Sequence, residues 1–236
     1  YMGRIFEKRK HKIFARNARI SKAFTKIGKE IAIAVKHGGA NPESNQKLRV
    51  AIQNAKGINM PKDKVEAAIK RASNKEEKDF QEVVYEGYAP HGVPVLVECA
   101  TDNPTRTVAN IRLIFSKNDG AMGNSGSVSF MFERRGVFKF ANGVLNLEEL
   151  ELDLIDAGAE DIDQGEEETI IYTKFTDFGS MQKFLEERKI EATNSELQYI
   201  PTTTKDLSEE QQDEVLKLIE ALEEDDDVQS VYHNLA

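Results

Sequence analysis

The chain has 236 residues, of which 39% are hydrophobic and 31% are charged, and its formal net charge at pH 7 is −9. This length exceeds what one compact core usually needs, so two or three domains are expected. No apolar run is long enough to span a membrane, and the single cysteine, Cys99, excludes an internal disulfide, which favours a reducing, cytoplasmic location.

The charge is divided unevenly along the chain. Residues 1–78 carry 20 Lys and Arg against 7 Asp and Glu, a balance of +13, whereas residues 79–236 carry 12 against 34, a balance of −22. A basic module is therefore joined to an acidic body, which indicates a negatively charged partner for the basic end.

The basic end is predicted to be helical. Its apolar residues recur at helical spacing: Ile20, Phe24, Ile27, Ile31, Ala34 and Val35. Cations recur on another face of the same helix: Arg19, Lys22, Lys26 and Lys29. At about 100° per residue the two sets centre roughly 140° apart, so one face can pack while the other stays in water. The pair Gly38 and Gly39 predicts the end of this helix.

Two further helices are expected before residue 78. Asn41 and Pro42 have the residue types of a cap and a first turn, and Pro61 repeats the pattern. The apolar stripes that follow predict three amphipathic helices around one small core. The polar segment at residues 73–79 is predicted to be a linker.

From residue 80 the pattern changes to strands and helices. Strands are predicted at residues 82–88, 93–100 and 126–133, the last with Val128, Phe130 and Phe132 alternating, and a helix at residues 101–118. Residues 136–205 follow with a β-α-β-β-α-β order, in which Asn146 and Glu149 are placed as a capping pair. The tail adds one helix, opened by a capping box of Ser208 and Gln211, and one strand.

A lone helix and strand cannot bury both their faces, so the tail is predicted to return to the first α+β unit. The predicted fold is α+β and multidomain, with an N-terminal three-helix domain and two ferredoxin-like α+β domains. Its parts are residues 1–78, a discontinuous middle domain of 79–135 plus 206–236, and an inserted domain of 136–205.

We find no convincing catalytic constellation. Four scattered histidines and one cysteine argue against a zinc site. The segment "DIDQGEEE" misplaces the glycine and lacks the final glutamate of a calcium loop, and "DGAMGNSGS" lacks the Lys-Ser/Thr of a phosphate loop. Asp102 and Asn103 form a polar pair at either a site or a helix cap, with the cap favoured. The acidic run at residues 223–229 is predicted to stay solvated. We therefore expect a protein that is not an enzyme and takes no cofactor, metal or small-molecule substrate.

The cations near the N-terminus are the strongest functional signal. No Asp or Glu occurs from Lys8 to Lys29, a stretch that contains nine Lys and Arg. Lysines on a helix can serve solubility alone, but such surfaces normally mix signs, and phosphate backbones are the common partner of an unmixed stripe. The predicted contact residues are Arg9, Lys10, Lys12, Arg16, Arg19, Lys22, Lys26 and Lys29. Phe6 and Phe14 are weaker candidates for stacking on bases.

Several stretches resemble the YebC family, also called the PmpR or translational-activator family. They are "FTKIGKEI", "KLRVAIQNAKGINMPKD", "YEGYAPHGVPVLVE", "TDNPTRTVANIR" and "GSVSFMFERRG", which occur in family order between Phe24 and Gly136. The resemblance implies a helical domain followed by two α+β domains. It also implies a cytoplasmic, non-enzymatic regulator, since bacterial members are mostly described as DNA-binding transcriptional regulators and mitochondrial relatives as translational activators.

The leading hypothesis is a nucleic-acid-binding regulator of gene expression, a DNA-binding transcriptional regulator of the YebC type. The alternative is a ribosome-associated translation factor that uses the same cations on ribosomal RNA. An enzyme using acids near "TDN" is the least favoured alternative. The sequence predicts neither the target sequence or codon context, nor the oligomeric state, nor the orientation of the domains.

Overall fold

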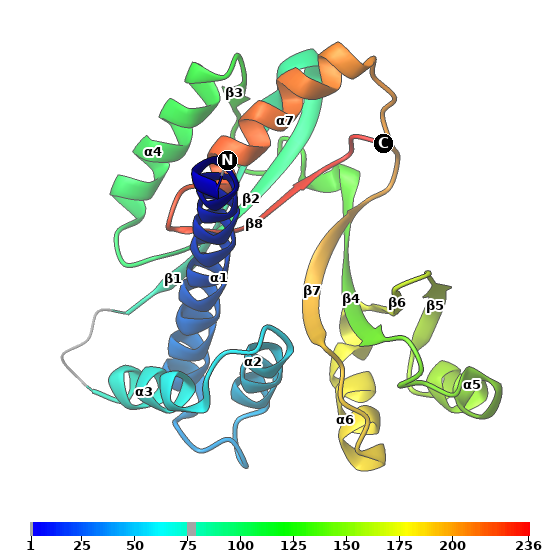
Figure 1. The fold of residues 1–236 in the computed structure, drawn as a ribbon. Coiled ribbons are helices and arrows are strands. Elements are labelled where there is room, and N and C mark those ends of the chain that lie inside the picture. Colours follow the sequence, from blue (N-terminus) through cyan, green and yellow to red (C-terminus); the bar gives the residue numbers. More distant parts are fainter. Residues whose placement is uncertain (1, 75–78) are drawn as a thin grey trace. The chain divides into compact units, whose positions relative to one another are not determined.

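The computed structural model describes the backbone of residues 2–74 and 79–236 and the side chains of residues 19–74 and 79–236. The chain divides into two compact units, Tyr1–Glu77 and Lys78–Ala236. The first unit is helical and the second holds the β-structure, and their hydrophobic cores are separate (Figure 1). Part of the predicted linker, residues 75–78, lies outside the described residues.

The first unit contains the helices α1 (Met2–Gly38), α2 (Gln46–Gly57) and α3 (Lys62–Ala72). Their apolar stripes meet in one buried cluster: Ile27, Ile31, Ala34, Val35, Leu48, Ala51, Ala55, Val65, Ala68 and Ala72. The predicted arrangement of three helices around a shared core is therefore confirmed. The expected apolar stripe begins too early, however, because Ile20 is an exposed side chain.

The second helix starts four residues later than predicted. Residues 41–44 form a turn, in which Asn41 Oδ1 accepts a hydrogen bond from the Glu43 amide at 3.0 Å. The cap of α2 is the buried Asn45, whose Oδ1 accepts from Leu48 N at 3.1 Å. Its Nδ2 donates to the carbonyls of Ala34 at 2.7 Å and Gly39 at 2.8 Å. One side chain thus begins α2 and satisfies carbonyls at the end of α1.

The second unit begins with strands β1 (Gln81–Ala89) and β2 (Val93–Thr101), joined by a short turn. Helix α4 (Pro104–Lys117), the short strand β3 (Ala121–Met122), helix α7 (Glu209–Glu223) and strand β8 (Val228–His233) complete this part. The antiparallel sheet has the order β3-β1-β2-β8. The predicted return of the tail is confirmed, since β8 pairs with β2.

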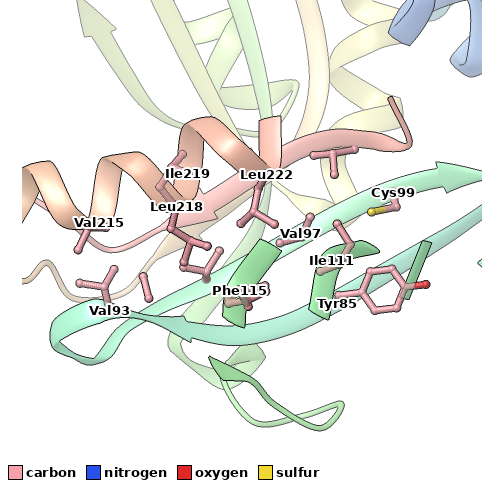
Figure 2. Close-up of a cluster of buried hydrophobic side chains, with 13 residues drawn as sticks. Tyr85, Val93, Val97, Cys99, Ile111, Phe115, Val215, Leu218, Ile219 and Leu222 are labelled. Atoms are coloured by element: carbon pink, nitrogen blue, oxygen red, sulfur yellow. The ribbon is translucent and has the colours of Figure 1, made fainter. Parts of the chain in front are cut away.

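Alternating residues of β1 and β2 form the core beneath α4 and α7. Figure 2 shows Val93, Val97 and Cys99 on the sheet facing Phe115 of α4 and Leu218 of α7. Phe115 and Leu218 are fully buried, and the buried thiol of Cys99 agrees with the expectation from its apolar surroundings. The capping box of Ser208 and Gln211 opens α7 as predicted.

The second sheet has the order β5-β6-β4-β7 and is antiparallel throughout. Its elements run β4 (Phe132–Ala141), α5 (Leu147–Asp156), β5 (Ala159–Gln164), β6 (Glu168–Lys174), α6 (Phe178–Arg188) and β7 (Asn194–Pro201). This is the β-α-β-β-α-β order that the sequence predicted, built on a core that includes Phe138, Phe140, Ile171, Leu154, Met181 and Leu185. Asn146 occupies the N-cap of α5, but its side chain makes no capping hydrogen bond.

The strand predicted at residues 126–133 is wrong. Residues Ser129–Met131 form a 3₁₀ turn, β4 begins at Phe132, and Phe130 is 71% exposed where an alternating strand would have buried it. The whole of β4 pairs with β6 and β7, so the predicted domain limit between residues 135 and 136 falls inside a strand of the second sheet.

The cause of this turn is the buried carboxylate of Glu86 on β1. Its oxygens accept hydrogen bonds from three backbone amides, Gly126 at 2.7 Å, Val128 at 2.7 Å and Ser129 at 2.9 Å. Burial by itself would raise the pKa of Glu86, but the hydrogen bonds from Val128, Gly126 and Ser129 outweigh it and hold the pKa below its ordinary value. The carboxylate therefore fixes the loop in a non-strand conformation.

Candidate nucleic-acid interface

The eight predicted contact residues all lie on α1. For Arg9, Lys10, Lys12 and Arg16 the structure gives the helical backbone, while their side chains lie outside the described residues, as do those of Phe6 and Phe14. Of the other four, Arg19 is exposed and Lys22 and Lys26 are partly exposed.

Lys29 departs from the expected wet stripe. The residue is only 9% exposed, whereas the predicted cationic face was expected to stay in water. Helical spacing places Lys29 in line with Lys22 and Lys26. The neighbouring residues Ile27 and Ile31 are buried in the core of the helical unit, so this part of α1 packs closely against the other helices. We therefore leave Lys29 out of the proposed contact set.

Further cations that the sequence analysis did not select lie on α2 and α3. The exposed ones are Lys47, Lys56, Lys62, Lys64, Lys70 and Arg71. The sequence does indicate that further cations exist, because residues 1–78 contain 20 Lys and Arg and fewer than half of them belong to the predicted contact set. Together with Arg19, Lys22, Lys26 and Lys36 of α1, they make up a set of exposed and partly exposed cations that we call the helical cationic surface: Arg19, Lys22, Lys26, Lys36, Lys47, Lys56, Lys62, Lys64, Lys70 and Arg71.

Some cations of the first unit already interact with other groups of the same unit. Lys64 Nζ lies 5.0 Å from the centroid of the Phe24 ring, which joins α3 to α1 and leaves Phe24 half-buried. Lys62 lies 3.7 Å from Glu66, a pair in which both side chains are exposed and which contributes little to stability. Arg49 is committed to the turn before α2, because its Nη1 donates to the Pro42 carbonyl at 2.8 Å.

The polar residues around "TDN" form a structural cluster. Asn103 caps α4 by accepting from Arg106 N at 3.1 Å, as the favoured interpretation predicted. The guanidinium of Arg106 lies 3.0 Å from Asp102 Oδ1 and 2.7 Å from Asp227 Oδ2, and Thr107 Oγ1 donates to the same Asp227 oxygen at 2.8 Å. These contacts give each charged group a partner, with Asp227 buried and the Arg106 side chain partly exposed.

This cluster corrects the prediction for the acidic run at residues 223–229. Asp227 is buried rather than solvated, because Arg106 and Thr107 of α4 donate hydrogen bonds to its carboxylate. The pair ties the start of α4 to the turn between α7 and β8.

Glu98 of β2 and Tyr232 of β8 form a second polar contact within the first sheet. Burial raises the pKa of Glu98, and Tyr232 Oη donates to its Oε2 at 2.9 Å. Burial likewise raises the pKa of Tyr232. Because these two residues lie on paired strands, their contact is explained as a cross-strand link within the sheet.

Among the described residues, no group of three or more His, Cys, Asp or Glu is placed to hold a metal ion. No helix in this part of the chain is long and apolar enough to cross a membrane.

Comparison with known proteins matches both units. Residues 4–75 match the family model described as the TACO1/YebC protein N-terminal domain, and residues 80–235 match the model of the TACO1/YebC second and third domain. A probable transcriptional regulatory protein of Cytophaga hutchinsonii is 56% identical, with 100% of this chain and 99% of that protein covered. One from Anaeromyxobacter dehalogenans is 55% identical with full coverage of both chains.

A solved structure agrees with the fold. The crystal structure of a conserved hypothetical protein from Aquifex aeolicus matches with a TM-score of 0.81 and 42% identity, over 92% of this chain and 90% of that one. The family models, the full-length relatives and this shared fold lead to one conclusion: the chain belongs to the TACO1/YebC family.

Proposed function

We propose that the protein is a nucleic-acid-binding regulator of gene expression, a DNA-binding transcriptional regulator of the YebC type, which contacts phosphates through the helical cationic surface together with Arg9, Lys10, Lys12 and Arg16 of α1. The observation that carries the proposal is the division of charge, +13 over residues 1–78 against −22 over residues 79–236. The relatives named as probable transcriptional regulatory proteins support the regulatory part of the proposal.

The mechanism of binding follows from the chemistry of the cations. Each Lys or Arg that neutralises a phosphate releases counterions, which favours binding and makes it sensitive to salt. If four to six cations contact a DNA duplex, the slope of log K against log salt concentration is about −4 to −5. The acidic second unit repels the same polyanion, so the molecule approaches with its basic unit first.

Contact with ribosomal RNA is the alternative, and the composition of the helical cationic surface is compatible with it. Among the residues whose side chains the structure describes, the exposed members of this surface are mostly lysines. Of the described arginines of the first unit, Arg19 and Arg71 are exposed, and Arg49 donates to the Pro42 carbonyl. A lysine-rich surface suits contact with backbone phosphates, which both DNA and ribosomal RNA provide.

The test is a double substitution on α1, Arg19→Gln with Lys22→Gln. We expect weaker binding to a fluorescein-labelled DNA duplex, by the same factor for unrelated sequences, and a salt slope reduced in magnitude by about 2, since each lost phosphate contact lowers it by about 1. Fluorescence anisotropy over roughly 50 to 200 mM salt measures both quantities. The matched control, Lys183→Gln with Lys217→Gln, removes two exposed charges from α6 and α7 of the second unit.

Equal losses for both pairs would contradict a localised surface. Co-sedimentation with ribosomes distinguishes the alternative. If the wild-type protein binds duplexes without any preference for sequence and sediments with ribosomes at moderate salt in a manner that depends on Arg19 and Lys22, the translational alternative replaces the transcriptional one.

A further inference from the structure

Helix α4 differs in charge from the rest of the acidic second unit. The segment Asn103–Phe132, which contains it, carries three cations and one acid, Asp119, whereas the remainder of residues 79–236 carries 9 cations and 33 acids. No Asp or Glu occurs within α4 itself. A polyanion is repelled by most of this unit, and α4 is the helix where that repulsion is weakest.

The packing of α4 determines which of its cations meet solvent. The fully buried residues Ile111 and Phe115 face the core of the first sheet, as Figure 2 shows for both. The opposite, exposed side includes Ala109, Arg112, Leu113, Ser116 and Lys117.

At about 100° per residue, Arg112 and Lys117 lie roughly 140° apart around the helix, with Leu113 and Ser116 between them. The two cations therefore flank the exposed face.

Arg112 and Lys117 also differ from most other cations of the unit. Five side chains lie within 4.0 Å of a carboxylate oxygen: Arg135, Lys139, Lys174, Lys183 and Arg188. On α4 itself, Arg106 is committed to Asp227 at 2.7 Å. Within the described part of the chain, Arg112 and Lys117 have no carboxylate at this distance. Their charges are available to an external anion.

We propose that the outer face of α4 is a second phosphate-binding surface, in which Arg112 and Lys117 contact the backbone of a nucleic acid. The inference rests on the proposed function and extends it to the second unit. With a rise of 1.5 Å per residue the two Cα atoms lie about 7.5 Å apart along the helix axis, close to about two nucleotide steps of 3.4 Å on one strand. The exposed side chains between the cations, Ala109, Leu113 and Ser116, carry no charge.

A protein partner is less well supported by this face. Leu113, 53% exposed, is the large apolar side chain between the two cations, and one such residue does not make the buried apolar centre of a standard protein interface. The surface therefore suits a ligand recognised by charge.

The experiment compares three double variants of the full chain: one on α4, one control elsewhere in the second unit, and the α1 variant Arg19→Gln with Lys22→Gln. Arg112→Gln with Lys117→Gln is expected to reduce the magnitude of the salt slope for a labelled DNA duplex or for a ribosomal RNA fragment by about 2. The control Lys183→Gln with Lys217→Gln, which removes the same charge from exposed positions of the same unit, is expected to leave the slope within error of wild type. Thermal unfolding followed by circular dichroism verifies that each variant is folded, as expected for exposed positions.

Each result has a definite meaning. A reduced slope for the α4 variant and an unchanged slope for the control support the proposal. If the α4 variant binds like the wild type or like the control while Arg19→Gln with Lys22→Gln remains defective, the second surface is refuted and the proposed function stands. If the wild type shows no salt-dependent binding to either nucleic acid, the proposed function fails and the role of α4 fails with it.

Discussion

Glu86 shows how one side chain decides the conformation of a distant loop. It lies 6% exposed on β1 and receives three backbone N–H groups from residues 126–129, which the chain reaches after β2 and α4. Hydrogen bonds to a charged group are worth about 1.5–3 kcal/mol each, and unmet buried donors add to the cost of losing them. The carboxylate of Glu86 thus anchors the loop that exposes Phe130.

Glu86→Gln is expected to lower the free energy of unfolding by roughly 2–4 kcal/mol at neutral pH, because the amide keeps one acceptor oxygen and turns an NH₂ group toward backbone donors. Urea denaturation measures the change. Glu151→Gln, at an exposed position of α5, is the control, with an expected change within about 0.5 kcal/mol. A loss no greater than that of the control would contradict the anchoring role.

The pH dependence of stability tests the same residue. Since the folded-state pKa of Glu86 is below its ordinary 4.5, its contribution is present above that value and is lost as the pH falls through the folded-state pKa. We expect the unfolding free energy of Glu86→Gln to fall less steeply than that of the wild type as the pH is lowered from 4.5 through the folded-state pKa. Parallel profiles for the two proteins would show that this carboxylate is not responsible.

Predictions from the sequence were least accurate where polar side chains determine the local structure. The apolar alternation of Val128, Phe130 and Phe132 indicated a strand, but the carboxylate that overrides it lies some forty positions away. Asp227 looked solvated because its partner Arg106 is still more distant along the chain. For α2 the predicted cap was Asn41, whereas the cap is Asn45, whose bonds to Ala34 and Gly39 the sequence does not reveal.

At the level of elements, the tail shows what periodicity does predict. The stripe of Val215, Leu218, Ile219 and Leu222 required a partner surface, and the first α+β unit lacked a cover for its sheet. Both needs are met when α7 packs on the core of β1 and β2 while β8 pairs with β2. The turn before β2 adds a contact, with His91 Nε2 lying 2.7 Å from Glu214 of α7. Burial of apolar stripes is a local property of the sequence, so helices and most strands were predictable.

Leu218→Ala is expected to lower the free energy of unfolding by about 2–5 kcal/mol, because it leaves a cavity between α7 and the sheet. Leu216→Ala on the same helix, where the side chain is 40% exposed, is the control and is expected to cost less than about 1 kcal/mol. Denaturant unfolding compares the two. Similar losses would mean that α7 does not form part of the core.

At the scale of the whole molecule, two units with separate cores carry opposite charge. The cations of α1 could be selected as candidate contacts from the charge bias alone, because that bias survives in any helical arrangement. The exposure of the cations of α2, α3 and α4, and the burial of Lys29, could not be predicted, since they depend on which side of each helix faces the core. Independent cores also imply that the units lose their structure in separate steps.

Leu48→Ala, at a fully buried position of α2, is expected to destabilise the helical unit by about 2–5 kcal/mol and to lower one calorimetric transition. Leu154→Ala, fully buried beside the second sheet, should lower a different transition and leave that of the helical unit in place. If both substitutions shift one common transition by similar amounts, the two units unfold as a single cooperative body.

Because the chain is synthesised from its N-terminus, the position of β8 after the β4–β7 sheet delays completion of the first sheet. Strand β2, apolar and buried along nearly its whole length, emerges early, yet β8, which covers one of its edges, is made only after the whole of the β4–β7 sheet. Throughout the synthesis of the inserted β4–β7 sheet that edge offers unpaired backbone groups to any other nascent strand. Newly made molecules, rather than finished ones, are therefore the population most in need of chaperone protection.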